Sequence, residues 1–375
     1  MNQSRQHIAI VGAGIMGRCL AWRLSDSGHD ITLFDQDAID TGQAAAYTAA
    51  GMLAPYSELE AAEDSIFQLG QHSLSLWKKW LKVWQAEHLW RGNGTLVIAH
   101  RQDQASLERF NRQLGAKLSE YDSETKSVRH LNKQQIAELE PELAERFEQA
   151  TYLSREACLD NHGLLQTMAK ALQSCGIQWR SPCKVHHIAP GRITSESGQE
   201  KFDHVFDCRG MGAKQQLPDL RAVRGELIHV QAQDVELTHM VRLMHPRYRL
   251  YLVPKANREY VLGATQIEAE DYSPMSVRSA LELLSALYAI HPGFAEARIL
   301  ENRSNCRPAL PDNQPRIQSQ SGLTEINGLF RHGFLLAPAL ADICVRRWQN
   351  EAAFSGEMAP LSRSLFYTAS PEFVQ

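Results

Sequence analysis

The stretch Ile8-Ala-Ile-Val-Gly-Ala-Gly-Ile-Met-Gly17 decides the fold class of this chain. A short apolar strand runs directly into the pattern G-x-G-x-x-G, formed by Gly12, Gly14 and Gly17, and a run of residues with helical spacing follows. In such a turn the first glycine permits a sharp bend, the second lets a pyrophosphate approach the backbone, and the third lets the helix pack closely on the sheet. The stretch therefore predicts a β-α-β unit that binds a dinucleotide at the helix N-terminus.

The second strand of this unit ends in an acidic residue. It is Ile31-Thr-Leu-Phe-Asp35, and its last residue follows the glycines at a distance of about 20 residues, as the dinucleotide pattern requires. A carboxylate at this position accepts hydrogen bonds from ribose hydroxyls and repels a 2′-phosphate, so NADP is disfavoured. These residues alone leave both FAD and NAD open as the cofactor.

Composition and charge exclude several classes of protein. The chain has 375 residues, 43% hydrophobic and 22% charged, which is typical of a globular protein of about two domains. A net charge of -4, without a stripe rich in lysine and arginine, argues against a nucleic-acid partner. The longest late apolar stretch, 333–345, is too short to span a membrane. Seven scattered cysteines without a C-x-x-C pair predict free thiols in a cytoplasmic protein, with neither a disulfide framework nor a metal site.

Later segments predict a second region of different character. Residues 225–270 contain short, alternating strands, which are typical of an antiparallel sheet. Residues 328–348 return to a glycine turn and a helix, with Pro338 near the start of that helix, where proline is tolerated. Further helices are expected near 74–84, 164–172 and 277–290.

Four blocks of sequence together resemble the D-amino-acid oxidase superfamily of FAD oxidoreductases, and specifically its glycine oxidase branch, which is tied to thiamin biosynthesis. The blocks are Val11–Gly17 with Phe34-Asp35, Ala49–Leu53, Tyr251–Pro254 with Gly263–Thr265, and Arg307-Pro308 with Phe330–Pro338. Their order and spacing cover nearly the whole chain. The resemblance implies an enzyme that binds FAD rather than NAD.

We therefore expect an α/β fold with two parts. One is a discontinuous, Rossmann-type FAD-binding domain, and the other is an α+β substrate domain built on an antiparallel sheet. The expected boundaries are 1–60, 150–224 and 322–375 for the FAD-binding domain, and 61–149 and 225–321 for the substrate domain.

The resemblance also assigns residues to the cofactor. Residues 49–53 would lie beside the flavin ring, Val185 against the adenine, Gly210 on the pyrophosphate side, and 331–335 at the pyrimidine edge. Relatives that bind flavin covalently use a cysteine at the position of Asn305, next to Cys306, so non-covalent FAD is expected. The expected FAD-binding residues are Gly12, Gly14, Ile15, Met16, Gly17, Asp35, Ala49, Ala50, Gly51, Met52, Leu53, Val185, Gly210, Arg331, His332, Gly333, Phe334 and Leu335.

Three residues are expected to act on the substrate. By resemblance, Tyr251 and Arg307 would hold its carboxylate, and a planar guanidinium suits this task because it offers two charge-assisted hydrogen bonds. Pro308 biases the backbone of Arg307 to an extended geometry. Arg331 would either add positive charge near the flavin ring or pair with an acid, and both alternatives stay open.

The function implied is oxidation of the amine of glycine, or of another small amino acid, to the imine. The amino acid and O2 are the expected partners, O2 would be reduced to H2O2, and the imine could feed thiamin thiazole synthesis. Three alternatives stay open: an amino-acid dehydrogenase that passes electrons to a quinone, a flavin protein that modifies tRNA, and a non-catalytic flavin subunit. No nucleic acid and no membrane span are expected, and a homo-oligomer stays open.

Overall fold

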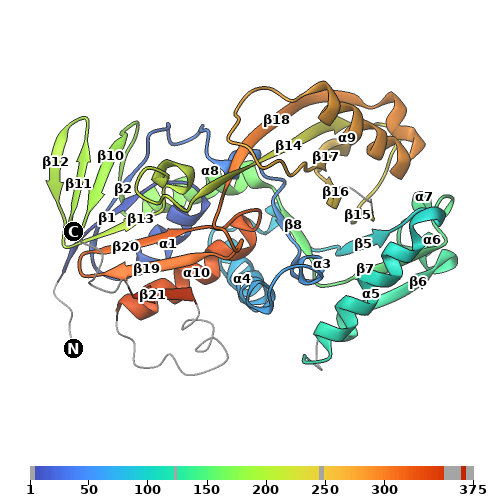
Figure 1. Cartoon of the computed structure of the whole chain (residues 1–375), viewed down its shortest axis with the longest axis horizontal. Helices are drawn as coiled ribbons and strands as arrows, with labels where there is room; N and C mark the ends of the chain where they lie inside the picture. Colours follow the sequence, from blue (N-terminus) through green and yellow to red (C-terminus); the bar gives the residue numbers. More distant parts are fainter. Residues whose placement is uncertain (1–4, 122–124, 245–248, 350–364, 369–375) are drawn as a thin grey trace.

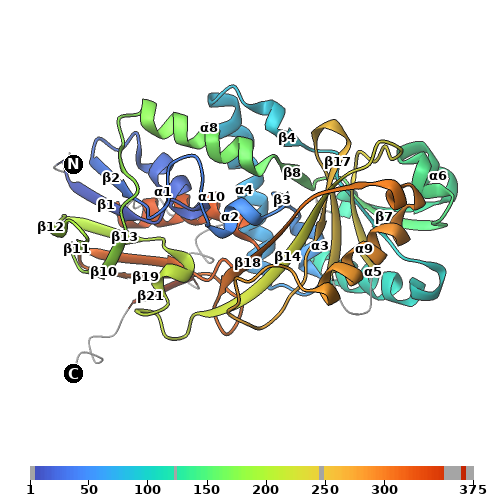
Figure 2. The same cartoon turned by 90° about the horizontal axis from the view of Figure 1, so that it is seen from above.

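The computed structural model describes residues 5–121, 125–244, 249–349 and 365–368. Two large sheets lie side by side, one towards each end of the molecule (Figures 1 and 2). Each sheet has its own layers of helices or strands, and the chain crosses between the two several times.

The first sheet contains seven strands and is parallel at its centre. Across the sheet the strands are β21 (Phe366–Thr368), β19 (Arg316–Gln320), β20 (Leu323–Asn327), β13 (His204–Asp207), β1 (His7–Val11), β2 (Asp30–Phe34) and β9 (Gln178–Arg180). The pair β19 and β20 is antiparallel. Parallel strands around a glycine turn are the arrangement that the sequence predicts, so the Rossmann-type part of the fold is confirmed.

Side chains of β1 point alternately into two different cores. Ile8 and Ile10 are buried with residues of four helices: α1 (Ile15–Leu24), α4 (Asp64–Val83), α8 (Asn161–Ser174) and α10 (Gly333–Trp348). Ala9 and Val11 pack on the other face against a small antiparallel sheet of β10 (Val185–Ala189), β11 (Arg192–Ser195) and β12 (Gly198–Lys201). Because both faces of β1 are covered, residues 8–11 are apolar at every position.

Pro338 lies inside α10, and not near its start as the sequence suggested. An internal proline has no N–H to donate, so the carbonyl four residues before it loses its helical partner. That carbonyl, of Phe334, accepts a hydrogen bond from Nε1 of Trp77 at 2.8 Å. The Oγ of Ser73 accepts one from the N–H of Ala339 at 3.1 Å. Helix α4 thus supplies side-chain partners on both sides of the proline.

The second sheet contains eight strands and is mostly antiparallel. Its order is β18 (Arg298–Ala309), β14 (Arg221–Gln231), β17 (Glu259–Gly263), β16 (Arg249–Pro254), β15 (Met240–Met244), β5 (Thr95–Ile98), β7 (Gln149–Leu153) and β6 (Val128–Asn132). One face packs on α6 (Lys133–Leu139), α7 (Pro141–Ala144) and α9 (Val277–Ile290), and the other on α3 (Pro55–Leu59) and α5 (Gln104–Leu118). The expected antiparallel sheet is confirmed.

Shorter elements complete the described chain. A three-stranded sheet contains β3 (Met52–Leu53), β8 (Ala157–Leu159) and β4 (Trp90–Arg91), and α2 (Ala45–Thr48) precedes it. The 3₁₀ helices are η1 (Glu87–Leu89), η2 (Arg101–Asp103), η3 (Thr125–Ser127), η4 (Gly210–Ala213), η5 (Ala256–Arg258) and η6 (Pro292–Glu296). Among the residues described, the structure contains no helix with the length and apolar character needed to cross a bilayer.

The expected domain boundaries stay a prediction. Helix α4 lies within 61–149 and shares a core with α10, and β19 lies within 225–321 and belongs to the first sheet. Some positions in the expected ranges, such as 350–364, lie outside the described residues.

Candidate active site

A cavity of about 1170 Å³ lies between the two sheets. The first sheet contributes the β1–α1 turn and the start of α10, and the second contributes residues of β14, β16 and β18. The segment that contains α2 and β3 lines a third side. This volume exceeds what a drug-sized ligand needs, so the cavity can hold a large cofactor together with a small substrate.

The β1–α1 turn brings bare backbone up to the cavity. Gly12 has a φ of +99°, and a Cβ there would lie 2.7 Å from the carbonyl oxygen of Cys208. A Cβ on Gly17 would lie 1.8 Å from the carbonyl oxygen of Gly12, so any larger residue would displace α1. Gly14 lines the cavity, and the nearest atom to a Cβ built there is 3.8 Å away. The N-terminal N–H groups of α1 are therefore accessible to an anionic ligand.

Asp35 lines the cavity just beyond the end of β2. Its carboxylate accepts hydrogen bonds from the N–H of Ala13 and, at 2.8 Å, from the N–H of Asp37. Burial raises the pKa of this carboxyl above its ordinary value, and the two N–H donors oppose that rise. An ionised carboxylate has about four acceptor sites, so Asp35 can also accept from a ligand hydroxyl.

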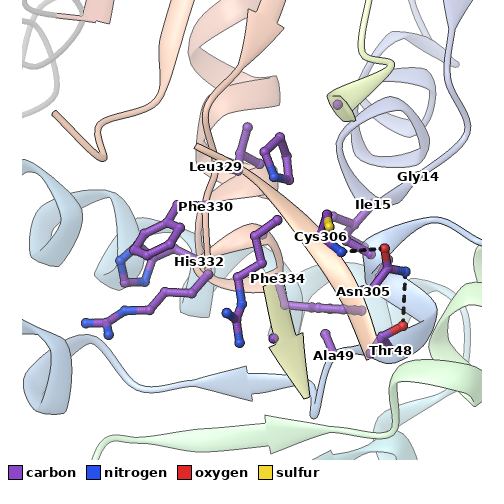
Figure 3. Close-up of a pocket in the computed structure, with 18 of the residues that line it drawn as sticks. Gly14, Ile15, Thr48, Ala49, Asn305, Cys306, Leu329, Phe330, His332 and Phe334 are labelled. Atoms are coloured by element: carbon purple, nitrogen blue, oxygen red, sulfur yellow. Dashed lines mark hydrogen bonds between the residues drawn. The ribbon is translucent and has the colours of Figure 1, made fainter. Parts of the chain in front are cut away.

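Two side chains from the second sheet hold the segment that contains Ala49–Leu53. Nζ of Lys255 donates to the carbonyl oxygens of Ala50 and of the last residue of β8, at 2.8 and 2.9 Å. Nδ2 of Asn305 donates to Oγ1 of Thr48 at 3.1 Å, an interaction that Figure 3 shows at the edge of the pocket. Residues in or next to two strands of the second sheet therefore fix the position of this segment.

The N-terminus of α10 opens onto the same cavity. Residues 332–335 line it, and a Cβ on Gly333 would lie 3.4 Å from a methyl carbon of Ile15 at the start of α1. The first turns of α1 and α10 contain no acidic residue. Two helix N-termini, each with a partial positive charge, therefore lie next to each other at the cavity wall.

Arg307 of β18 presents a half-buried guanidinium to the cavity. It crosses over the neighbouring strand, where a Cβ on Gly225 would lie 2.2 Å from Nη2. Nη1 donates to the carbonyl oxygen of Thr265 at 3.1 Å, and within the described part of the chain the guanidinium forms no ion pair with a carboxylate. Desolvation, followed by the charge of Arg331, lowers its pKa to about 10. Such a cation can bind an anionic group of a ligand.

Tyr251 and Arg331 meet at one buried carboxylate, that of Glu58 in α3. The hydroxyl of Tyr251 donates to Oε1 of Glu58 at 3.2 Å, and Nη2 of Arg331 pairs with Oε2. Burial raises the pKa of Tyr251 well above its ordinary value. Arg331 is therefore paired with an acid while it lines the cavity, and its role beside the flavin ring stays a prediction. The hydroxyl of Tyr251, expected on a substrate carboxylate, here contacts a carboxylate of the protein itself.

The structure brings most of the residues expected from the sequence to one cavity. Gly17 and Leu53 are not part of this lining: Gly17 packs against the turn and Leu53 is fully buried in the core. The expected residues that line the cavity are Gly12, Gly14, Ile15, Met16, Asp35, Ala49, Ala50, Gly51, Met52, Val185, Gly210, Tyr251, Arg307, Arg331, His332, Gly333, Phe334 and Leu335.

Comparison with known proteins decides the family. The family described as FAD dependent oxidoreductase matches residues 7–347. The chain belongs to this family. A Rhizobium etli protein that carries the name thiamine biosynthesis oxidoreductase ThiO is 38% identical over 346 residues, which covers 92% of this chain and 97% of the relative.

Solved structures show that this FAD dependent oxidoreductase shares its fold with proteins of known structure. The crystal structure of glycine oxidase from Geobacillus kaustophilus matches with a TM-score of 0.82 and 22% identity, over 96% of this chain and 98% of that one. That of iminodiacetate oxidase from Chelativorans sp. BNC1 matches with a TM-score of 0.82 and 23% identity, over 96% and 99%. At these identities the likeness establishes the fold.

The cavity of this FAD dependent oxidoreductase fits its cofactor. The bare backbone at Gly14 and the N-terminus of α1 suit a pyrophosphate, and Asp35 suits a ribose. The segment 49–53 and the N-terminus of α10 suit the flavin ring. Sγ of Cys306 lies 3.5 Å from the carbonyl oxygen of Asp271, as expected for a thiol with a partner in the protein. Among the described residues no cluster of three or more side chains could hold a metal ion.

Sequence reasoning missed two residues of the oxidoreductase site. Neither Glu58 nor Lys255 belongs to the glycine turn or to the four blocks of the resemblance. A signal existed for each. Glu58 is separated by a single serine from residues 52–56, which carry no charge and are mainly apolar, and a carboxylate buried in such a segment needs a partner. Lys255 directly follows an apolar strand.

Proposed function

We propose that this chain oxidises the amine of glycine, or of another small amino acid, to the imine and passes the electrons to O2. In balanced form, H2N–CH2–COO⁻ and O2 give HN=CH–COO⁻ and H2O2. The name of the Rhizobium etli relative and that of the Geobacillus kaustophilus neighbour both support this proposal.

The observation that carries the proposal is the guanidinium of Arg307. It lies in the same cavity as the glycine turn, and its recorded acceptors are backbone carbonyl oxygens rather than a carboxylate. A ligand with one carboxylate supplies the negative charge that balances this guanidinium. Because Gly225 has no side chain, the guanidinium of Arg307 can occupy the space above it. The register of β14 with β18 therefore determines the position of the guanidinium.

The residues of the chain bind and orient the substrate. Arg307 holds the carboxylate, which places the adjacent α-carbon in the cavity. FAD, when bound, supplies the acceptor for the two electrons that leave the amine. The ammonium form of the substrate must lose a proton before oxidation, because only the neutral amine has a lone pair to form the C=N bond.

The experiment begins with the absorption spectrum of the purified protein. We expect a yellow protein whose FAD is released by acid precipitation and whose flavin absorbance is bleached by glycine without oxygen. In air, an oxygen electrode should record one O2 consumed for each imine formed. Flavin that stays in the precipitate would show covalent attachment. Reduction of a quinone analogue without O2 uptake would show a dehydrogenase.

We further propose that the enzyme acts in the cytoplasm and that its imine feeds thiamin thiazole synthesis. The seven free cysteines are compatible with a reducing compartment. The thiamin connection is supported by the name of the Rhizobium etli relative. Growth of a deletion strain without thiamin, with and without the gene on a plasmid, tests the pathway.

A further inference from the structure

Glu58 places a negative charge in the wall of the proposed substrate site. It lies in α3, its side chain is 8% exposed, and it lines the cavity beside Arg331 and Tyr251. Oε2 pairs with Arg331, Oε1 accepts from the hydroxyl of Tyr251 at 3.2 Å, and Nε2 of His332 lies 3.9 Å from Oε2. The proposed oxidation assigns no task to this carboxylate.

Helix α3 is anchored firmly, so the position of Glu58 is set by the fold. The hydroxyl of Ser57 donates to Oε2 of the buried Glu156 at 2.8 Å. Nη1 of the buried Arg242 donates to the carbonyl oxygen of Ser57 at 2.7 Å, and its Nη2 pairs with Glu60. The residues on both sides of Glu58 are therefore tied to the second sheet.

The two arginines of this wall differ in one respect. The guanidinium of Arg331 has a carboxylate partner, Glu58, whereas that of Arg307 donates to carbonyl oxygens. The two are close enough that the charge of Arg331 lowers the pKa of Arg307, and Glu58 acts in the opposite direction. Of these two cations, Arg331 is therefore neutralised by a carboxylate and Arg307 is not. A third arginine of the lining, Arg242, is paired with Glu60.

We propose that Glu58 determines substrate specificity by limiting the site to one carboxylate. This inference rests on the proposed function and deepens it. A substrate with one carboxylate binds Arg307 and leaves the Glu58–Arg331 pair intact. A substrate with a second carboxylate, such as iminodiacetate, would bring that group towards Glu58 while Arg331 is already paired. Like charges brought together in a partly buried site cost affinity.

The test compares three amines in the holoenzyme: glycine, N-methylglycine and iminodiacetate. N-methylglycine controls for the added bulk on nitrogen. We expect Glu58→Gln to raise kcat/KM for iminodiacetate, relative to N-methylglycine, by about tenfold or more, because Arg331 becomes available to the second carboxylate. Asp64→Asn removes the same charge from a residue at the start of α4 that does not itself line the cavity, and it should leave this ratio unchanged.

A second variant tests the role of Arg331 directly. In Glu58→Gln combined with Arg331→Gln, both charges are absent, so the gain for iminodiacetate should disappear. A gain that persists would overturn the proposal, and so would an equal loss for all three amines in Glu58→Gln with normal FAD content. The latter result would show that Glu58 holds the substrate nitrogen or the site geometry.

A binding measurement separates this inference from the proposed function. Calorimetric titration of the wild-type holoenzyme with acetate and malonate needs no turnover, and we expect malonate to bind no more tightly than acetate. Tighter binding of malonate to the wild type would overturn the inference, even if Glu58→Gln failed to fold. If no amine is oxidised at all, the proposed function fails, and this titration still decides the role of Glu58.

Discussion

Arg307 is a single residue on which the proposed substrate contact depends. We expect Arg307→Leu to lower kcat/KM for glycine by about a hundredfold to several thousandfold, which corresponds to about 3–5 kcal/mol for the loss of a desolvated charged contact. A small amine without a carboxylate never uses the contact and should be affected far less. Steady-state kinetics with both substrates, together with FAD content, measure this.

A matched control exists in the same strand. Arg298 begins β18 and its side chain is 76% exposed, so Arg298→Leu should change neither substrate's kcat/KM. If Arg307→Leu impairs both substrates alike and lowers FAD content, Arg307 is a structural cation and the carboxylate contact is refuted.

Substitutions of Asp35 test the proposed contact with the ribose of FAD. We expect Asp35→Ala to weaken FAD binding by about 1–3 kcal/mol, because a ligand hydroxyl loses a charged acceptor. Asp35→Asn should lose less, since its amide oxygen can still accept from the N–H of Ala13 and keep the turn in place. Dissociation constants measured by fluorescence titration of the apoprotein decide this. Unchanged FAD affinity in Asp35→Ala would exclude the ribose contact, and Asp40→Ala, an exposed change in the following loop, is the control.

The residues that the glycine pattern predicted, without the resemblance, are those whose chemistry is local. Gly12 and Gly17 belong to one turn, and the steric demand on Gly17 arises inside it, from the carbonyl oxygen of Gly12. The partners of Glu58 and Lys255 lie far away in the chain, so no local pattern connects them. The acceptors of Arg307 were unpredictable for the same reason, because they depend on the register of β14 with β18.

At the scale of elements, the contact between α4 and α10 yields a prediction about stability. Trp77 donates to the carbonyl of Phe334, which lacks its helical partner because of Pro338. Trp77→Phe leaves this buried carbonyl without a hydrogen-bond donor. We expect this loss to lower the free energy of unfolding by about 1–3 kcal/mol, in addition to the small cost of the lost apolar volume.

A double-mutant cycle isolates that hydrogen bond. In Pro338→Ala the new N–H can bond to the carbonyl of Phe334 itself, so Trp77→Phe should cost less in that background. Urea unfolding of the four proteins provides the free energies. Equal costs in both backgrounds would show that Trp77 stabilises the helix pair by packing alone.

Other elements escaped the sequence for physical reasons. Strand β6 is an edge strand whose side chains are mostly exposed, so it lacks the apolar alternation that marks strands. Strand β18 has mostly exposed or half-buried residues along its length and gave no signal either. Strands β1 and β2 were predictable because their faces are covered and their sequences are apolar runs.

At the scale of the whole molecule, each of the two large sheets contains a histidine whose pKa is lowered, and His204 is buried whereas His229 is half-buried. Burial lowers the pKa of His204, in β13 of the first sheet, to about 4, and that of His229, in β14 of the second, also to about 4. His204 is 2.9 Å from Oγ1 of Thr324 in the adjacent strand. Protonation of His204 therefore opposes folding of the sheet that contains it. For His229 the desolvation is opposed in part by the carboxylate of Glu301, which lies 3.6 Å from Nδ1.

These two histidines predict how the stability of the protein depends on pH. In the unfolded chain a histidine has a pKa of about 6.5, so between pH 6.5 and 4 the unfolded state binds more protons than the folded state. The free energy of unfolding should therefore be highest above about pH 6.5 and fall as the pH is lowered towards 4.

His204→Gln removes one of these groups and retains an amide that can bond to Thr324, so the stability of this variant should fall less steeply over this range. Urea unfolding of the holoenzyme at pH 7.5 and 5, with the exposed His187→Gln as control, measures the difference. A parallel fall in all three proteins would assign the acid sensitivity to other groups, such as the carboxylates that pair with arginines across the fold.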